Sequence, residues 1–144
     1  MVSLKSLPLW LMGAASAALF GVAEYATLNA KEAAPSALTA DAIDEGKDIY
    51  QRRCGACHSI DANRIGPKHR DVFGRTAGGD PDYNYSNALI QSDLIWNEET
   101  LDEWLMNPEA TIPGQKMGYR LSNKNERQAI IAYLRSQSTN SKTP

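Results

Sequence analysis

The sequence predicts an all-α protein in which three to four short helices are joined by long loops. Apolar residues recur at helical spacing in separate stretches, and the three longest stretches carry helix-capping residues. No stretch shows the convincing alternation of polar and apolar residues that marks a strand. The 144 residues are enough for one domain with an extension, so only a small hydrophobic core is expected.

The charge balance argues against a nucleic-acid-binding protein. The formal net charge is −2, and Lys5 is the only charged residue before Glu24, so the rest of the chain carries −3. No basic run and no aromatic platform interrupts this acidic balance. We therefore expect no nucleic-acid partner.

Residues 1–23 differ in composition from the rest of the chain. Lys5 precedes an uncharged apolar run over residues 7–23, which ends in small residues at the sites that a signal peptidase reads. A signal peptide is the first interpretation, and an N-terminal membrane anchor through residues 7–23 is the alternative, since about 20 apolar residues span a bilayer. Either one places the following domain outside the cytoplasm.

The remaining boundaries follow from composition. Residues 24–40 are predicted to be a flexible linker, with Ala-Ala-Pro-Ser near its middle. The folded domain is expected over residues 41–137. The polar residues 138–144 are expected to form a disordered tail.

The first predicted helix begins at Asp41 as the N-cap and ends near Arg53, with acidic residues Asp44 and Glu45 in its first turn. Its buried face is expected to contain Ile43, Gly46 and Tyr50. Because glycine inside a helix costs about 1 kcal/mol relative to alanine, Gly46 suggests a close approach to another helix.

Loops and further helices follow. Residues 61–81 are rich in glycine and proline and predict a long loop, which is unusual unless it wraps something. A short helix is expected within residues 84–92. Another is expected from an N-cap at Asn97 to Asn107-Pro108, and it buries Leu101, Trp104 and Leu105.

The last predicted helix follows a loop over residues 111–119. Asn123 and Glu126 have the spacing of a capping box at its start. The residues expected to face inwards are Ala129, Ile130, Tyr133 and Leu134.

The motif that carries chemistry is Cys54-Gly55-Ala56-Cys57-His58, which contains both cysteines of the chain. Positions i and i+3 of a helix share a face, so both thiols can reach one flat partner while His58 turns an imidazole nitrogen towards its centre. Covalent attachment of a c-type haem has this pattern: thioether bonds from Cys54 and Cys57, and an iron–imidazole bond from His58.

Three other interpretations of the cysteines are weaker. A thioredoxin-like pair needs a βαβ setting, and no strand pattern precedes Cys54. A structural zinc site needs four ligands, which His69 alone does not complete. A disulfide between such close neighbours closes almost no loop and stabilises little.

A second iron ligand has few candidates. Met1 and Met12 belong to the leader, and Met106 beside Leu105 is predicted to be a core residue. Met117 lies in a loop with Pro113 and Gly114. From these residues alone, both ligation and core packing remain open for Met117.

Residues 46–134 resemble a class I c-type cytochrome, of the kind that includes mitochondrial cytochrome c and bacterial periplasmic relatives. The matching segments, in order, are Cys54–His58, Gly66-Pro67, Val72–Arg75, Tyr83–Ser86, Trp96–Thr100, Asn107-Pro108, Pro113–Met117 and Ile131–Leu134. The resemblance implies the small cytochrome c fold, with loops wrapped around one covalent haem.

The resemblance also implies residue roles. Met117 is implied to be the sulfur ligand opposite His58, and Pro67 to accept a hydrogen bond from the His58 ring. The implied partners of the haem propionates are Arg75, Tyr85 and Trp96. The implied crossing of the first and last helices involves Gly46, Tyr50 and Tyr133.

A few positions depart from the mitochondrial pattern. Trp104 replaces a tyrosine that often hydrogen-bonds the methionine sulfur, and its indole could do the same or simply pack. Gln115 replaces a usual threonine. His69 replaces an apolar residue near the haem and is a weak rival iron ligand. Glu109 and Ala110 replace docking lysines, which leaves Lys116 and Lys124 at the haem edge.

The expected function is single-haem electron transfer rather than enzymatic catalysis. The expected partners are a quinol–cytochrome c reductase-type donor and a terminal oxidase or reaction centre as acceptor. The expected location is the bacterial periplasm, with the protein soluble or tethered to the outer face of the inner membrane. The alternatives are a membrane-anchored subunit of a respiratory or photosynthetic complex, or a five-coordinate haem that binds gas or peroxide.

Overall fold

A computed structural model describes residues 39–139 of the chain. Within them lie α1 (Ala40–Arg53), α2 (Asn87–Ile90), α3 (Glu98–Met106), α4 (Pro108–Thr111) and α5 (Lys124–Ser136). The described part has no strand, only one isolated antiparallel bridge between Thr76 and Ile95. The all-α prediction is confirmed. The predicted leader over 1–23 and nearly all of the linker over 24–40 lie outside the described residues.

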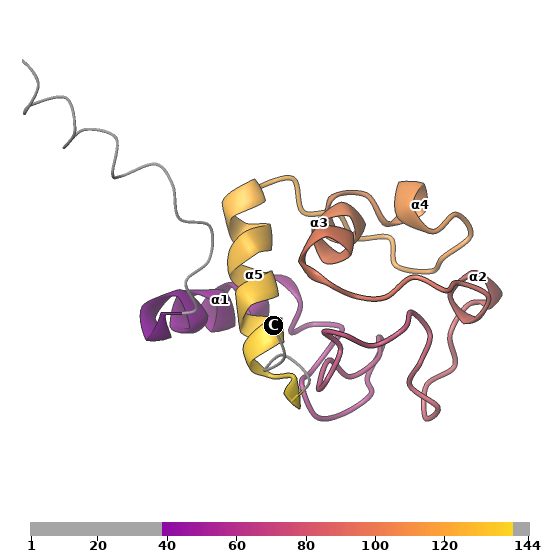
Figure 1. Ribbon diagram of the computed structural model, residues 1–144, viewed down its shortest axis with the longest axis horizontal. Coiled ribbons are helices and arrows are strands. Elements are labelled where there is room, and N and C mark those ends of the chain that lie inside the picture. The colour runs from indigo at the N-terminus through magenta and orange to yellow at the C-terminus, as the bar shows by residue number, and fades with distance from the viewer. Residues whose placement is uncertain (1–38, 140–144) are drawn as a thin grey trace, which may run out of the picture. The chain divides into compact units, whose positions relative to one another are not determined.

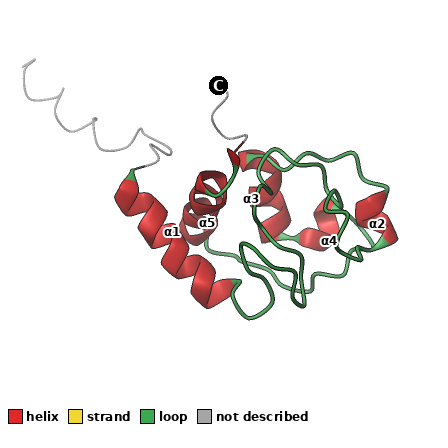
Figure 2. Cartoon of the chain, turned by 90° about the horizontal axis from the view of Figure 1, so that it is seen from below, coloured by secondary structure: helices red, strands yellow, loops and turns green. Residues whose placement is uncertain are grey.

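Helices α1 and α5 pack against each other at one end of the domain, and α2 lies at the other end (Figure 1). Helix α3 packs against α5 and α4, and long loops connect these elements, as Figure 2 shows. The core gathers apolar side chains from α1, α3 and α5. Its buried members on these helices include Ile49, Tyr50, Leu101, Leu105, Ile130, Ile131 and Leu134.

Gly46 lies where α1 crosses α5. A Cβ atom at this position would collide with the carbonyl oxygen of Ala129 and lie 2.9 Å from the Cβ of Tyr133. Only glycine therefore lets the two backbones approach this closely. The expected close helix approach at Gly46 is confirmed.

The start of α1 corrects the sequence prediction. The N-cap is Thr39, whose Oγ1 accepts a hydrogen bond from the Ala42 N–H at 3.2 Å. Asp41 lies in the first turn, and Asp44 and Glu45 lie beyond it. Both Thr and Asp favour N-cap positions, and the prediction considered only Asp41, which lies two residues after the cap.

We expect Thr39→Ala to destabilise the domain by about 1 kcal/mol, because the Ala42 N–H loses its acceptor. Asp41→Ala removes only a charge near the helix dipole and should cost about 0.5 kcal/mol or less. Urea unfolding of both variants measures the difference. A larger loss for Asp41→Ala would contradict the assignment of the cap.

The other helix ends agree with the predictions in part. Asn97 caps α3 as predicted, in a capping box with Thr100. Helix α2 spans only Asn87–Ile90 and is capped by Ser86, so it is shorter than the predicted 84–92 segment. Helix α4 was not predicted, since Pro108 was interpreted only as the end of α3, although proline also favours the first turn of a helix.

Two side chains on α3 and α5 differ from expectation. Met106, predicted to be core, is 50% exposed at the end of α3. The Asn123 side chain caps α5, but the Glu126 carboxylate accepts from Arg53 of α1 at 2.9 Å instead of closing a capping box. This ion pair ties the end of α1 to the start of α5.

Helix α5 is also tied to α3 and to the loop before it. The guanidinium of Arg127 is buried and donates two hydrogen bonds to Asp102, at 2.8 and 3.1 Å. It also donates to the carbonyls of Leu121 and Ser122. A buried charge needs such partners, because desolvation is costly.

The chain beyond α5 is held by specific contacts up to Thr139. Ser138 is buried, and its hydroxyl donates to the Leu134 carbonyl and accepts from the Phe73 N–H. Thr139 donates two hydrogen bonds to Asp71. These residues fall inside the predicted tail over 138–144, of which residues 140–144 lie outside the described part.

Candidate functional site

One cavity of about 540 Å³ lies among the loops and helices of the domain. This volume is in the range of sites that hold organic ligands. All nine predicted site residues line the cavity: Cys54, Cys57, His58, Pro67, Arg75, Tyr85, Trp96, Trp104 and Met117. The structure thus brings together residues that are up to 63 positions apart in the sequence.

The cysteine motif continues the path of α1 as a tight turn. Cys54 is the C-cap of α1, and its carbonyl accepts from the N–H groups of Cys57 and His58 at 3.0 and 2.9 Å. Burial raises the pKa of the Cys54 thiol to about 12, and Cys57 adds to the effect. A redox-active pair instead needs a lowered thiol pKa, so the burial of Cys54 does not suit the thioredoxin-like interpretation.

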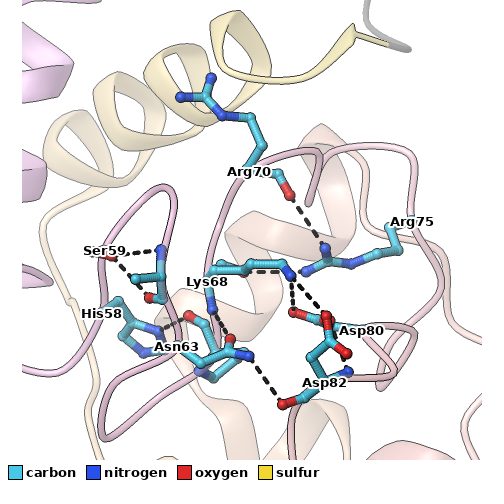
Figure 3. Close-up of polar contacts among 10 residues, drawn as sticks. His58, Ser59, Asn63, Lys68, Arg70, Arg75, Asp80 and Asp82 are labelled. Carbon is cyan, nitrogen blue, oxygen red and sulfur yellow. Dashed lines mark hydrogen bonds and ion pairs between the residues drawn. The ribbon is translucent and has the colours of Figure 1, made fainter.

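His58 is held in one orientation by the loop that follows it. Its Nδ1 lies 2.8 Å from the carbonyl oxygen of Pro67, and an N–H must donate in this pair (Figure 3). Burial lowers the pKa of His58, and the hydrogen bond to Pro67 partly opposes this shift. A neutral imidazole protonated at Nδ1 keeps a lone pair at Nε2, which is the form that binds a metal.

Gly66 shapes the space around the same ring. A Cβ atom at Gly66 would lie 2.6 Å from both ring nitrogens of His58. The Gly66 N–H donates to the Cys57 carbonyl at 2.8 Å, which fixes the loop against the motif. The Gly66-Pro67 pair therefore both admits and orients the imidazole.

His69 packs against the ring of His58. Its ring stacks on the His58 ring with centroids 4.2 Å apart and planes inclined by 20°. Its Nδ1 shares a hydrogen bond of 3.1 Å with the Tyr50 hydroxyl, and burial brings the pKa of His69 well below its usual value. A ring stacked face to face on His58 is not placed across an iron atom from it, so this geometry disfavours His69 as a rival ligand.

Arg75 and Trp96 are brought together by the short antiparallel contact between their segments. The Trp96 N–H donates to the Arg75 carbonyl at 2.9 Å, and the Gly74 N–H donates to the Trp96 carbonyl at 2.6 Å. Trp96 also packs edge-on against Trp104, with ring centroids 5.2 Å apart. Both indoles form part of the cavity wall and of the core.

The guanidinium of Arg75 has one buried nitrogen left over. Its Nη atoms donate to the carbonyls of Arg70 and Lys68 at 3.2 and 3.3 Å, whereas its buried Nε has no hydrogen-bonding partner within residues 39–139. Tyr85, on the same cavity, is buried, and burial raises its pKa. A partly buried cation beside a phenol suits an anionic group, such as a propionate.

Met117 reaches the cavity from the loop after α4. It is half-buried and packs against the core. Its backbone N–H donates to the Gln115 side-chain oxygen. The carboxylate of Glu109 in turn accepts from the Gln115 side chain at 3.3 Å and from the Gly114 N–H at 3.1 Å.

Sequence reasoning missed this bracing of the methionine loop. The sequence marks Gln115 only as a replacement for a usual threonine and Glu109 only as a replacement for a docking lysine. Glu109 accepts from residues five and six positions further along the chain, across a turn. No short-range sequence pattern predicts contacts of this kind. The only available signal was the polar Gln115 within a loop that also contains proline and glycine.

A c-type haem fits this donor set. The cavity offers two thiols, an imidazole oriented through Nδ1, a thioether and a partly buried guanidinium whose Nε has no partner among the described residues. Gly66 leaves room for the imidazole. Thioether attachment, axial ligation and a propionate partner each find residues of the appropriate chemistry.

Comparisons with known proteins agree with the geometry. The family model for cytochrome c matches residues 43–138. Cytochrome c2 of Afifella marina is 39% identical over 106 residues, which cover 69% of this chain and 85% of that protein. Cytochrome c2 of Agrobacterium tumefaciens is 44% identical over 90 residues, covering 58% of this chain and 81% of that protein.

A solved structure shows the same relationship. Cytochrome cH from Methylobacterium extorquens superposes with a TM-score of 0.62 at 35% identity, covering 65% of this chain and 97% of that one. Its fold agrees with the predicted small cytochrome c fold. The chain therefore belongs to the cytochrome c family, whose members carry a covalent c-type haem, attached here through Cys54 and Cys57.

Proposed function

We propose that this cytochrome is a single-haem electron carrier in which His58 and Met117 are the two axial ligands of the iron. The supporting observation is that both side chains line the same cavity, although they come from separate segments. His58 is neutral and oriented by Pro67, and Met117 lies on a loop braced by Gln115 and Glu109. The bound haem supplies one-electron chemistry.

The protein's own residues then set the conditions for transfer. Two protein ligands leave no coordination position for a substrate, which favours a carrier over a catalyst. Pairing histidine with methionine raises the reduction potential, and the Pro67 hydrogen bond tunes the basicity of the imidazole. Arg75, Tyr85 and Trp96 would hold the propionates.

Docking is proposed at the rim of the cavity. Lys116 and Tyr119 line it and are exposed, as is Ile65 at 77%. A rim with few charges favours short-lived complexes with redox partners. Its charges would affect the rate of association more than the affinity. The proposed donor is of the quinol–cytochrome c reductase type, and the proposed acceptor is a terminal oxidase or a reaction centre.

The proposed location is the bacterial periplasm, with the protein either soluble or tethered to the outer face of the inner membrane. The similar proteins include bacterial cytochromes c2, which supports this assignment. Within residues 39–139, no helix combines the length and the apolar character needed to cross a membrane. A retained apolar segment over residues 7–23 in the mature protein would favour the membrane-anchored subunit.

Optical spectra of the oxidised and reduced protein test the proposal. We expect low-spin spectra in both states and slow or absent binding of carbon monoxide to the reduced protein, because Met117 fills the second axial position. A high-spin spectrum with rapid carbon monoxide binding would contradict the carrier. It would support the five-coordinate haem that binds gas or peroxide.

A further inference from the structure

The most buried carboxylate near the cavity belongs to Asp80, whose side chain is only 2% exposed. Its Oδ2 lies 3.4 Å from the Lys68 ammonium and has no hydrogen-bonding donor among the described residues. The same ammonium lies 3.4 Å from the Asp82 carboxylate, which is exposed (Figure 3). A buried carboxylate needs a nearby opposite charge, so Lys68 is the group that compensates Asp80.

The backbone around Lys68 accepts hydrogen bonds from two side chains of the haem site, His58 and Arg75. The carbonyl just before it, that of Pro67, accepts from the His58 ring at 2.8 Å. The carbonyl of Lys68 itself accepts from Arg75 Nη2 at 3.3 Å. A displacement of this one residue therefore moves the acceptors of both His58 and Arg75.

Further contacts connect the Lys68 segment to the Asp80–Asp82 turn. The Lys68 N–H donates to Asn63 Oδ1 at 2.7 Å, and Asn63 Nδ2 donates to the Asp82 carbonyl at 3.1 Å. The Asp82 N–H donates to Asp80 Oδ1 at 3.1 Å, which closes the turn. Figure 3 shows this network linking the loop after His58 to the loop after Arg75.

We propose that Lys68, Asp80 and Asp82 form an ion cluster that positions the Pro67 carbonyl on His58 and the Lys68 carbonyl on Arg75. The three members are positioning residues, because they act on the haem site through these two carbonyls. The inference rests on the proposed role of His58 as an iron ligand. It assigns a function to a buried charge that the ligand set alone leaves unexplained.

The test uses Lys68→Met and Asp80→Asn in the haem-loaded protein. Either change breaks the cluster, so the Pro67 carbonyl should hold the His58 Nδ1–H less firmly. We expect this proton, followed by NMR in the reduced protein, to exchange up to about tenfold faster in both variants, because a hydrogen bond contributes about 0.5–1.5 kcal/mol and about 1.4 kcal/mol corresponds to a factor of ten. The double variant should exchange no faster than Lys68→Met alone, because both changes break one contact.

Two control variants sharpen the test. Lys47→Met removes the same charge from an exposed position on α1 and should leave the exchange rate at its parental value. Lys68→Arg keeps the charge between the two carboxylates and should restore slow exchange. Asp80→Asn keeps the inference testable if Lys68→Met fails to fold, because it breaks the same contact from the other side.

A purely electrostatic role gives a different pattern. Removing a cation and removing an anion would then move the reduction potential in opposite directions, with no change in the exchange of the His58 proton. A purely stabilising role would lower the denaturant midpoint and also leave that exchange unchanged. Either pattern would overturn the positioning role.

The proposed function fails in a separate way. If the parent protein shows no slowly exchanging His58 ring proton in its reduced low-spin state, then His58 ligation is wrong, and the inference falls with it. A normal parental signal that stays unchanged in Lys68→Met and Asp80→Asn overturns the cluster's role and leaves the carrier intact.

Discussion

Replacing Met117 with alanine is expected to convert the haem iron from a closed to an open site and to lower its reduction potential. The thioether is lost and alanine offers no donor, so the reduced protein should bind carbon monoxide rapidly. The potential should fall by on the order of 0.1 V or more, because axial ligands shift haem potentials over a range of about 0.8 V. Potentiometry and carbon monoxide binding measure both effects.

Met106→Ala is the matched control. Met106 is the other methionine of the described domain, it is half exposed at the end of α3, and it does not line the cavity. We expect its replacement to leave the potential and the closed iron site unchanged. If Met117→Ala behaves like this control, the assignment of Met117 as a ligand is wrong.

The site was more predictable from the sequence than the helix ends were. Cys54, Cys57 and His58 form a local motif whose spacing carries the chemistry, and the structure extends α1 directly into it. The cavity residues from Pro67 to Met117 were predicted through the resemblance to a family, which contains the long-range information that spacing lacks. All of them line one cavity.

The errors at helix ends have local physical causes. Met106 was grouped with its buried neighbour Leu105, but successive helical residues point about 100° apart, so the last residue of α3 faces away from the core. Thr39 and Asp41 both suit an N-cap, and only the backbone geometry of Thr39 decides between them. Pro108 ends α3 and also begins α4, and the prediction used only the first effect.

The buried charges could not be predicted from patterns at all. Asp80 lies in a stretch rich in glycine and proline, where a carboxylate normally faces water. Its burial depends on Lys68, which the fold places beside it across a loop. The same holds for Arg127, whose partner Asp102 is 25 residues away on another helix. Pairings of this kind arise from tertiary structure and leave no periodic signal.

Gly46→Ala is expected to destabilise the domain more than any other single methyl addition on α1. The new Cβ would collide with the Ala129 carbonyl, and backbone cannot rotate away as a long side chain does. We expect a loss of about 3 kcal/mol, at the upper end of the cost of overpacking, despite the better helix propensity of alanine. For a domain of this size, the midpoint of thermal unfolding should fall by more than about 10 °C.

Gly118→Ala provides the comparison. No described residue lies within 4 Å of a Cβ built at Gly118, which is exposed on the cavity lining, so the same chemical change adds no collision with another residue there and should shift the unfolding midpoint much less. The difference between the two variants then isolates the crossing of α1 and α5 from any general effect of replacing glycine. Equal unfolding midpoints for the two variants would show that α1 and α5 can move apart at little cost in free energy. The close approach at Gly46 would then contribute little to the stability of this helix pair.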